Sequence, residues 1–170
     1  YAAPFRATGR AARRREKELA AQISEELINT VGTGLDRADI EAMNSGLYRI
    51  PKSIEKFAER YVLVNERLKG VDFGQRTKIL VACAQTVNEM VIELRHGLHI
   101  DVMRKLQDRL QALEAEADKL LLEPYRTFYA TATDPIQAIL AKDLFEILEK
   151  AIDKCRDVGN VIYSIVLKNS

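Results

Sequence analysis

Apolar residues recur every three or four positions along almost all of this 170-residue chain, and strict alternation of apolar and polar residues is nearly absent. That spacing is typical of helices that bury one face, whereas alternation is typical of strands. Only eight glycines and four prolines interrupt the pattern, which favours long helices joined by short connections. The sequence therefore predicts an all-α protein, and helices of this length pack most simply as an elongated antiparallel bundle.

Breaks in the pattern divide the chain into five expected helices, over residues 10–30, 37–68, 75–97, 100–129 and 135–168. Asp36 and Asp134 each stand where an N-cap is needed for the helix that follows. In the first helix, Leu19, Ile23 and Leu27 recur at four-residue spacing, so we expect this stripe to face the core.

The two halves of the chain echo each other, since each has a helix, a short break and then a long helix opened by an Asp cap. We expect one domain over residues 1–170, built from two related helical bundles that share long helices. The first bundle is expected over about 1–97 and the second over about 98–170. Because the chain begins with Tyr1 rather than Met, we expect its N-terminus to be incomplete.

The composition limits which partners and which cellular compartment we expect for this protein. The formal net charge is +1 at pH 7, so a strong general attraction to nucleic acid is not expected. Cys83 and Cys155 each lie alone within an apolar helical pattern, which indicates buried free thiols and a reducing compartment. No segment approaches the roughly 20 apolar residues that a transmembrane helix needs.

Two rows of carboxylates lie at four-residue spacing in the second half: Glu114 and Asp118 in one helix, and Glu149, Asp153 and Asp157 in the last. Residues four apart stack on one helix face, where like charges destabilise by roughly 0.2–0.5 kcal/mol per pair. Both rows lie one position off the apolar seams of their helices. If these helices are antiparallel neighbours, all five carboxylates line one groove and their repulsion requires compensation.

Two kinds of compensation stay open at this point. Clusters of oxygen ligands suit Mg, Ca, Mn or Fe, and helical bundles commonly build metal sites from carboxylates on facing helices. The alternative is a solvated acidic stripe balanced by nearby basic side chains: Lys119, Lys150, Lys154 and Arg156.

Three stretches carry a resemblance to a known family: residues 36–40 (DRADI), 113–118 (LEAEAD) and 143–162 (DLFEILEKAIDKCRDVGNVI). They resemble the PhoU-like phosphate-transport regulators, and most closely the branch found beside Pit-type phosphate permeases. The resemblance covers nearly the whole chain and implies two related three-helix bundles that bind divalent or iron-type metal ions through short acidic motifs. The matching positions in this chain are Glu114, Asp118, Glu149, Asp153 and Asp157.

The first half departs from this family pattern. Where the family's other acidic motifs fall, this chain has Arg13 with Lys17, and Tyr48 with Lys52. Lys and Arg offer no lone pairs to a metal, so we expect no cation site there. If the two helices are neighbours, these four side chains would form an anion site instead, for phosphate, an acidic side chain or a lipid headgroup. The alternative is exposed side chains that pair weakly with nearby glutamates: Glu16, Glu18 and Glu55.

Other catalytic patterns are missing from the sequence, which has no Ser/His/Asp pattern, Gly-rich phosphate loop or Cys-xx-Cys motif. His96 and His99 flank Gly97 at a helix break, where we expect a surface or capping role. The resemblance implies a non-enzymatic, cytoplasmic regulatory or accessory protein of phosphate transport. Its implied partner is a phosphate permease or a signalling protein at the inner face of the membrane.

Two other functional classes stay open: a carboxylate-bridged metalloenzyme and a purely structural helical dimer. The metalloenzyme is disfavoured, because its ligand sets normally include Glu-xx-His pairs and neither histidine here stands three positions after a glutamate. We also expect a homodimer, because helices this long leave apolar positions that two small bundles do not cover.

Overall fold

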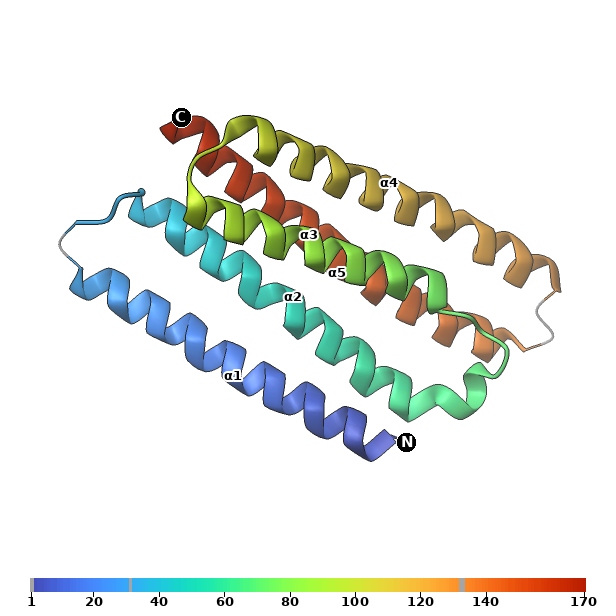
Figure 1. The fold of residues 1–170 in the computed structure, drawn as a ribbon. Helices are drawn as coiled ribbons and strands as arrows, with labels where there is room; N and C mark the ends of the chain where they lie inside the picture. The colour runs from blue at the N-terminus through green and yellow to red at the C-terminus, as the bar shows by residue number, and fades with distance from the viewer. Residues whose placement is uncertain (1, 31, 132–133) are drawn as a thin grey trace.

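The computed structural model describes residues 2–30, 32–131 and 134–170, and the chain is helical almost throughout these ranges. The elements are α1 (Ala2–Asn29), α2 (Arg37–Val64), a short 3-10 turn η1 (Asn65–Leu68), α3 (Gly74–His96), α4 (Ile100–Thr131) and α5 (Pro135–Asn169). No strand occurs within the described ranges, so the predicted all-α bundle is confirmed. Consecutive helices run antiparallel, and the molecule is elongated along their common direction (Figure 1).

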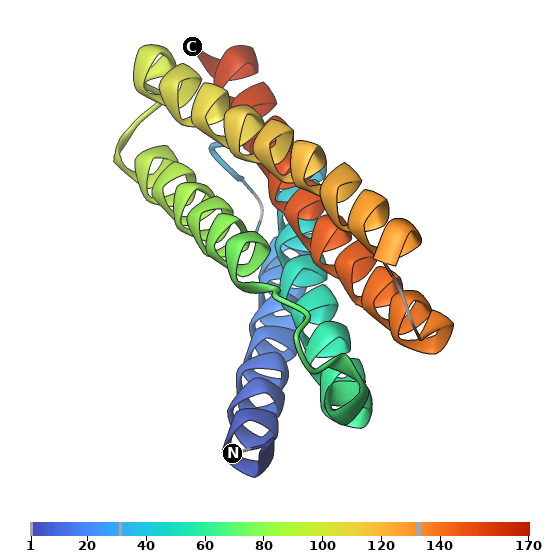
Figure 2. The same cartoon turned by 90° about the vertical axis from the view of Figure 1, so that its right-hand side faces the viewer.

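The helices pack as a group of three with a pair beside it. α3, α4 and α5 each pack against the other two, whereas α2 packs against α1 and α5. Within the described residues α1 contacts α2 alone, and Figure 2 shows it at the edge of the molecule. The expected division of the chain near residue 97 falls between α3 and α4, and it stays a prediction.

The central helix of the fold is α5, because it packs against α2, α3 and α4. Its buried residues include neighbours in the sequence, such as Ile147 with Leu148 and Ile165 with Val166. Consecutive positions on a helix point about 100° apart, so a helix with a single narrow apolar stripe would not bury both members of such pairs. The broad apolar surface of α5 is what allows three helices to pack around it.

Two glycines bring neighbouring helices close to α5. A Cβ atom placed on Gly46 of α2 would lie 2.6 Å from Cγ2 of Val158, and a Cβ on Gly159 would lie 2.3 Å from Cδ2 of Leu110 in α4. Both distances are far shorter than the optimal carbon–carbon separation of about 3.5–4.0 Å. Larger residues at these positions would therefore push the helices apart.

The predicted helix starts are confirmed at the two aspartate caps. A carboxylate oxygen of Asp36 accepts a hydrogen bond from the backbone N–H of Ala38 at 2.8 Å, and Asp134 accepts one from Ile136 at 2.9 Å. The first helix begins at Ala2 rather than near residue 10. The segment before residue 10 contains three alanines, which favour a helix, and its proline lies in the first turn, where proline is tolerated.

The stripe expected to face the core from α1 is placed differently. Leu19 and Ile23 are 46% and 41% exposed, so the prediction was wrong for both, whereas Leu27 is half-buried. The side of α1 that meets α2 lies about a quarter-turn away, where Asn44 of α2 donates a hydrogen bond to the backbone carbonyl of Ala20 at 3.0 Å. In the described part of the chain α1 packs against α2 alone, and Leu19 and Ile23 lie outside that contact.

Cys83 and Cys155 are both buried and free, as expected. Burial raises the pKa of the Cys83 thiol to about 11 and that of Cys155 to about 12. A search of the described helices finds none that combines the length and apolar character needed to cross a membrane.

Candidate metal-binding groove

The two predicted rows of carboxylates face each other across α4 and α5. We call the surface that carries Glu114, Asp118, Glu149, Asp153 and Asp157 the groove. Arg156 of α5 forms an ion pair with Glu114 of α4, which joins the two helices directly. The same guanidinium lies 3.8 Å from Asp153 and 3.2 Å from Asp157 on its own helix. The side chain of Glu114 is only 17% exposed, so this ion pair is partly shielded from solvent. One end of the groove therefore carries its own internal cation.

The other end of the groove holds Asp118, Glu149 and Asp153. Burial raises the pKa of Glu149, and the charges of Asp153 and Asp118 raise it further. Burial also raises the pKa of Asp153; Arg156 opposes this shift, and Asp118 adds to it. Both shifts show that the ionised forms are disfavoured where like charges are held together in a partly buried place.

The apolar seams of the two helices hold these acids in position. Ala117, Leu148 and Ile152 are 3% exposed or less, and each is followed directly in the sequence by an acid of the groove. The carboxylates therefore lie at the border of the α4–α5 contact, where Glu149 and Asp153 are half-buried and Asp118 is exposed.

Asp157 lies in more mixed surroundings than the other acids. Besides Arg156, it borders a surface hollow of about 260 Å³ between α2 and α5, whose polar lining includes Ser45, Arg49 and Lys154. Its side chain is 63% exposed, so solvent also screens its charge. Among the described residues, Asp118 and Glu149 have no ion-pair partner, and Asp153 lies 3.8 Å from Arg156, which also pairs with Glu114.

The donor chemistry of this end suits a hard cation, because three carboxylates supply oxygen ligands of the kind that Mg²⁺, Ca²⁺ and Mn²⁺ prefer. Within the described residues, however, no three Asp, Glu, His or Cys side chains are gathered closely enough to hold a metal ion as they stand. Ligation by Asp118, Glu149 and Asp153 would therefore require their side chains to move toward one another. At the other end of the groove, the carboxylate of Glu114 already pairs with Arg156, so a cation would have to compete with Arg156 for it.

Sequence reasoning named Arg156 only as one of four balancing cations and did not identify its central place. A signal was present, since Arg156 stands three positions after Asp153 and one before Asp157, where a long side chain can reach both. Its contact with Glu114 depends on the register of α4 against α5, which spacing within one helix does not give.

The four residues of the predicted anion site lie on α1 and α2: Arg13, Lys17, Tyr48 and Lys52. Arg13 lies over the ring of Tyr48, with its guanidinium carbon 4.1 Å from the ring centre, so the two helices are neighbours there. The same guanidinium forms ion pairs with Glu16 and, at 3.3 Å, with Glu55. The two lysines are exposed and form no ion pair with a described residue. Anion binding by this cluster stays a prediction, and Arg13 already has two carboxylates to balance it.

Both histidines lie at the connection between α3 and α4, outside the groove. His96 ends α3, and Gly97 follows with φ +155°. Nδ1 of His99 lies 2.5 Å from a carboxylate oxygen of Glu93 on α3. This pairing is the surface role that the sequence predicts for His99.

No protein-family model matches the chain. The chain is similar to the UPF0111 protein YkaA of Bacillus subtilis (strain 168), with 23% identity over 146 residues. The aligned residues cover 86% of this chain and 71% of YkaA. Most of both chains therefore aligns, at an identity that leaves the function to be argued from the residues themselves.

Proposed function

We propose that this protein is a non-enzymatic regulatory or accessory protein of inorganic phosphate transport that binds a divalent or iron-type cation in the α4–α5 groove. It acts by contact with a phosphate permease or a signalling protein at the cytoplasmic face of the membrane. The observation that carries the proposal is the nearness of Asp118, Glu149 and Asp153. The charges of Asp153 and Asp118 add to burial in raising the pKa of Glu149, and Asp118 also raises the pKa of Asp153, against the opposing effect of Arg156.

The link to phosphate transport comes from the family resemblance of residues 113–118 and 143–162. The similarity to the UPF0111 protein YkaA supports it indirectly, because UPF0111 is a PhoU-like family. The order of the acidic motifs along the chain and their convergence in space agree with that resemblance.

A cation bound at this end would neutralise the repulsion between the two rows and tie α4 to α5. Asp118, Glu149 and Asp153 would hold it, whereas Arg156 continues to balance Glu114. Binding would therefore change the charge and the rigidity of one exposed edge of the bundle. A partner protein can recognise such a change by binding to this edge, without any chemical reaction taking place in the groove.

The alternative, a carboxylate-bridged metalloenzyme, finds less support in the arrangement of the side chains. Such sites normally draw imidazole ligands from the same helices as their carboxylates. Here both histidines lie at the α3–α4 connection, and His99 is paired with Glu93.

Metal binding is tested by isothermal titration of Mg²⁺, Ca²⁺, Mn²⁺ and anaerobic Fe²⁺ into protein that has been freed of metal with a chelator. We expect saturable binding of at least one ion, and weaker binding in Asp118→Asn and Asp153→Asn. Asp101→Asn is the matched control, because this aspartate lies on α4 but its side chain is 84% exposed and pairs with Arg104. Equal binding in all three variants, or no saturable binding of any ion, would refute the metal site.

The transport role is tested separately, by uptake of radiolabelled phosphate in cells that produce a Pit-type phosphate permease with or without this protein. We expect uptake to change when the protein is present and the change to be smaller with Asp118→Asn. The transport proposal would be refuted if uptake is unchanged and the protein fails to co-purify with the permease after cross-linking. That result would not bear on the metal site.

A further inference from the structure

The hollow between α2 and α5 combines an apolar lining with polar side chains of both helices. It has a volume of about 260 Å³, and its apolar lining comes from Ala42, Gly46, Val158 and Val161. The residues that α2 contributes to this lining are small, so they leave the space above α5 open. We call this surface the α2–α5 hollow.

Two basic side chains and one hydroxyl line the α2–α5 hollow without a partner among the described residues. Ser45 and Arg49 stand four positions apart on α2, so they lie on the same face of that helix. Lys154 reaches the hollow from α5 and is half-buried. Neither Arg49 nor Lys154 lies within 4.0 Å of a carboxylate of a described residue, and the hydroxyl of Ser45 forms no hydrogen bond with one. Lys154 lowers the pKa of Asp153 only from beyond that distance.

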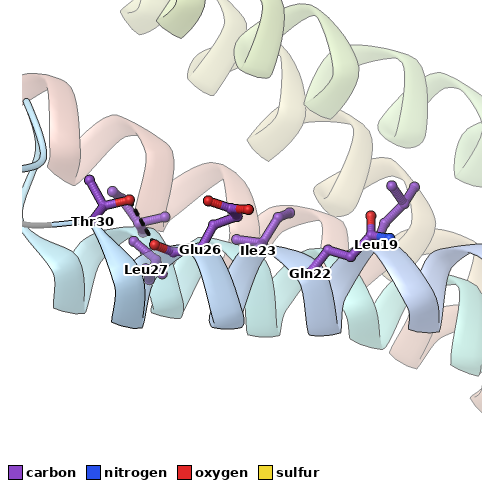
Figure 3. Close-up of a pocket in the computed structure, with 7 residues that line it drawn as sticks. Leu19, Gln22, Ile23, Glu26, Leu27 and Thr30 are labelled. Carbon is purple, nitrogen blue, oxygen red and sulfur yellow. Dashed lines mark hydrogen bonds between the residues drawn. The ribbon is translucent and has the colours of Figure 1, made fainter.

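Figure 3 shows a contrasting case, a hollow on α1 that has the same volume of about 260 Å³. Its polar lining consists of Gln22, Glu26 and Thr30, and neither a lysine nor an arginine lines it. The hydroxyl of Thr30 is already used, because it donates a hydrogen bond to the backbone carbonyl of Glu26 at 2.7 Å (Figure 3). The available space is therefore similar in the two hollows, and what distinguishes the α2–α5 hollow is its set of unpaired donors.

These donors suit a small oxyanion. A guanidinium offers several N–H groups in a fixed plane, an ammonium offers a compact positive charge, and a hydroxyl can donate one further hydrogen bond. Hydrogen bonds from charged donors to an oxyanion are about twice as strong as those between neutral groups. The hollow is ample for a tetrahedral oxyanion, and such an ion would separate the two positive charges that now face the same space.

Asp157 determines which oxyanion fits, because it brings a carboxylate to the same hollow. Its charge is partly balanced by Arg156 at 3.2 Å, but it still repels an anion that has no proton to share. Inorganic hydrogen phosphate carries a P–OH group that can donate a hydrogen bond to a carboxylate. Sulfate has no such proton at neutral pH, and a phosphate monoester loses its last one with a pKa near 6. The carboxylate therefore favours inorganic phosphate over the other two.

We propose that the α2–α5 hollow binds inorganic hydrogen phosphate, with Ser45, Arg49 and Lys154 as donors. Asp157 accepts the hydrogen bond of the P–OH group and gives the site its selectivity. The site is distinct from the α1–α2 cluster that the sequence predicts as an anion site, where Arg13 already has two carboxylates to balance it. It requires neither a bound metal nor a permease, so its test is independent of the tests of the proposed function.

Binding is tested by isothermal titration of inorganic phosphate into the full chain, in HEPES buffer with a chelator and at constant ionic strength. We expect saturable binding that weakens by about tenfold or more in Arg49→Gln and in Lys154→Gln, because each loses a charge-assisted hydrogen bond. Lys150→Gln is the matched control, since Lys150 is exposed one turn before Lys154 and does not line the hollow. Circular dichroism shows whether each variant is folded. Absence of saturable binding, or an equal loss in the control, would overturn the proposal.

Lys52→Gln distinguishes the two anion sites. It removes a cation of the α1–α2 cluster and should leave phosphate binding unchanged. If Lys52→Gln weakens binding while Lys154→Gln does not, the anion binds in that cluster and the α2–α5 hollow is not the site.

Titration of sulfate and of glycerol phosphate tests the selectivity, with glycerol phosphate standing for phosphate held in a lipid headgroup or another ester. We expect inorganic phosphate to bind at least severalfold more tightly than either. Asp157→Asn should remove most of this preference, chiefly by strengthening the binding of sulfate, because the amide no longer repels it. Equal binding of all three anions by the wild type would overturn hydrogen phosphate as the ligand, and an unchanged preference in Asp157→Asn would overturn the role of Asp157.

Discussion

Replacing Arg156 with glutamine is expected to destabilise the metal-free protein by about 2–3 kcal/mol. The change leaves Glu114, whose side chain is 17% exposed, without the cation that balances it. Leaving a mostly buried polar group unpaired costs about 1–3 kcal/mol. It also removes the charge that separates Asp153 from Asp157, and like charges four apart on a helix contribute roughly another 0.2–0.5 kcal/mol.

The assay is equilibrium unfolding in urea with a chelator present, followed by circular dichroism at 222 nm. For a chain of this size the expected loss corresponds to a lower melting temperature by very roughly 5–10 °C. A divalent cation should then restore more stability to the Arg156→Gln variant than it adds to the wild type, because the variant groove holds an additional uncompensated carboxylate. At a cation concentration of 100 times the dissociation constant, the gain is about 2.7 kcal/mol.

The matched control is Arg109→Gln. Arg109 makes the same kind of ion pair between helices, with Glu89 of α3 at 3.1 Å, but both side chains are about half exposed (48% and 47%). Such a pair contributes about 0–1 kcal/mol. If the two glutamine variants lose the same amount of stability in chelator, the ion pair in the groove is no more important than a surface pair. Arg156 would then not be a stabilising cation for Glu114 at that end of the groove.

Three further predictions concern single sites. Gly159→Ala should lower the free energy of unfolding by about 1–3 kcal/mol, because its methyl group would meet Cδ2 of Leu110 at 2.3 Å and this overpacking outweighs the helix propensity of alanine. Glu149→Gln should raise the stability of the metal-free protein at pH 7 but not at pH 3: the pKa of Glu149 is raised by folding, so its ionised form lowers stability as pH rises above the ordinary glutamate range. With the thiol pKa values raised to about 11 at Cys83 and about 12 at Cys155, neither thiol of the folded protein should react with a disulfide reagent at pH 8 within minutes.

Each of these has a clear control. Gly32→Ala, where no atom lies within 4 Å of the new methyl group, should change stability little, and equal losses at both glycines would argue against overpacking. For Glu149→Gln, an unchanged difference from the wild type between pH 3 and pH 7 would show that the charge of this group is not the cause. For the cysteines, the unfolded protein in urea should react at once with two equivalents of reagent, and rapid reaction before unfolding would show that the thiols are accessible.

The helices and the acidic rows could be predicted from the sequence because both depend on local spacing. The caps at Asp36 and Asp134 are signals within four residues of the helix starts that they make. The acids at four-residue spacing, one step from the apolar seam, were placed in one groove by the same kind of local argument. Both rows border the apolar seams of their helices, and helices pack through such seams, so the two rows were expected to meet.

Features that depend on the neighbours of a helix could not be predicted in this way. Leu19 and Ile23 form as good an apolar stripe as any in the chain, but the pattern does not say whether a partner is present to cover it. Asn44 anchors α2 to a different side of α1, through a hydrogen bond to a backbone carbonyl that no side-chain pattern reveals. Similarly, the contact between Arg156 and Glu114 depends on how far α4 is shifted along α5.

The central position of α5 has a consequence for how the chain reaches its fold. During synthesis α1 to α4 leave the ribosome before α5, yet α5 makes the main contacts that join α2 to the α3–α4 pair. Until α5 arrives, the apolar sides of α2, α3 and α4 that it later covers remain open to water and to aggregation. The contacts of α2 with α5 also join residues that are far apart in sequence, a topology that slows folding compared with helical hairpins. We therefore expect nascent chains that lack α5 to require chaperones, and α5 to join both helix groups in one cooperative step.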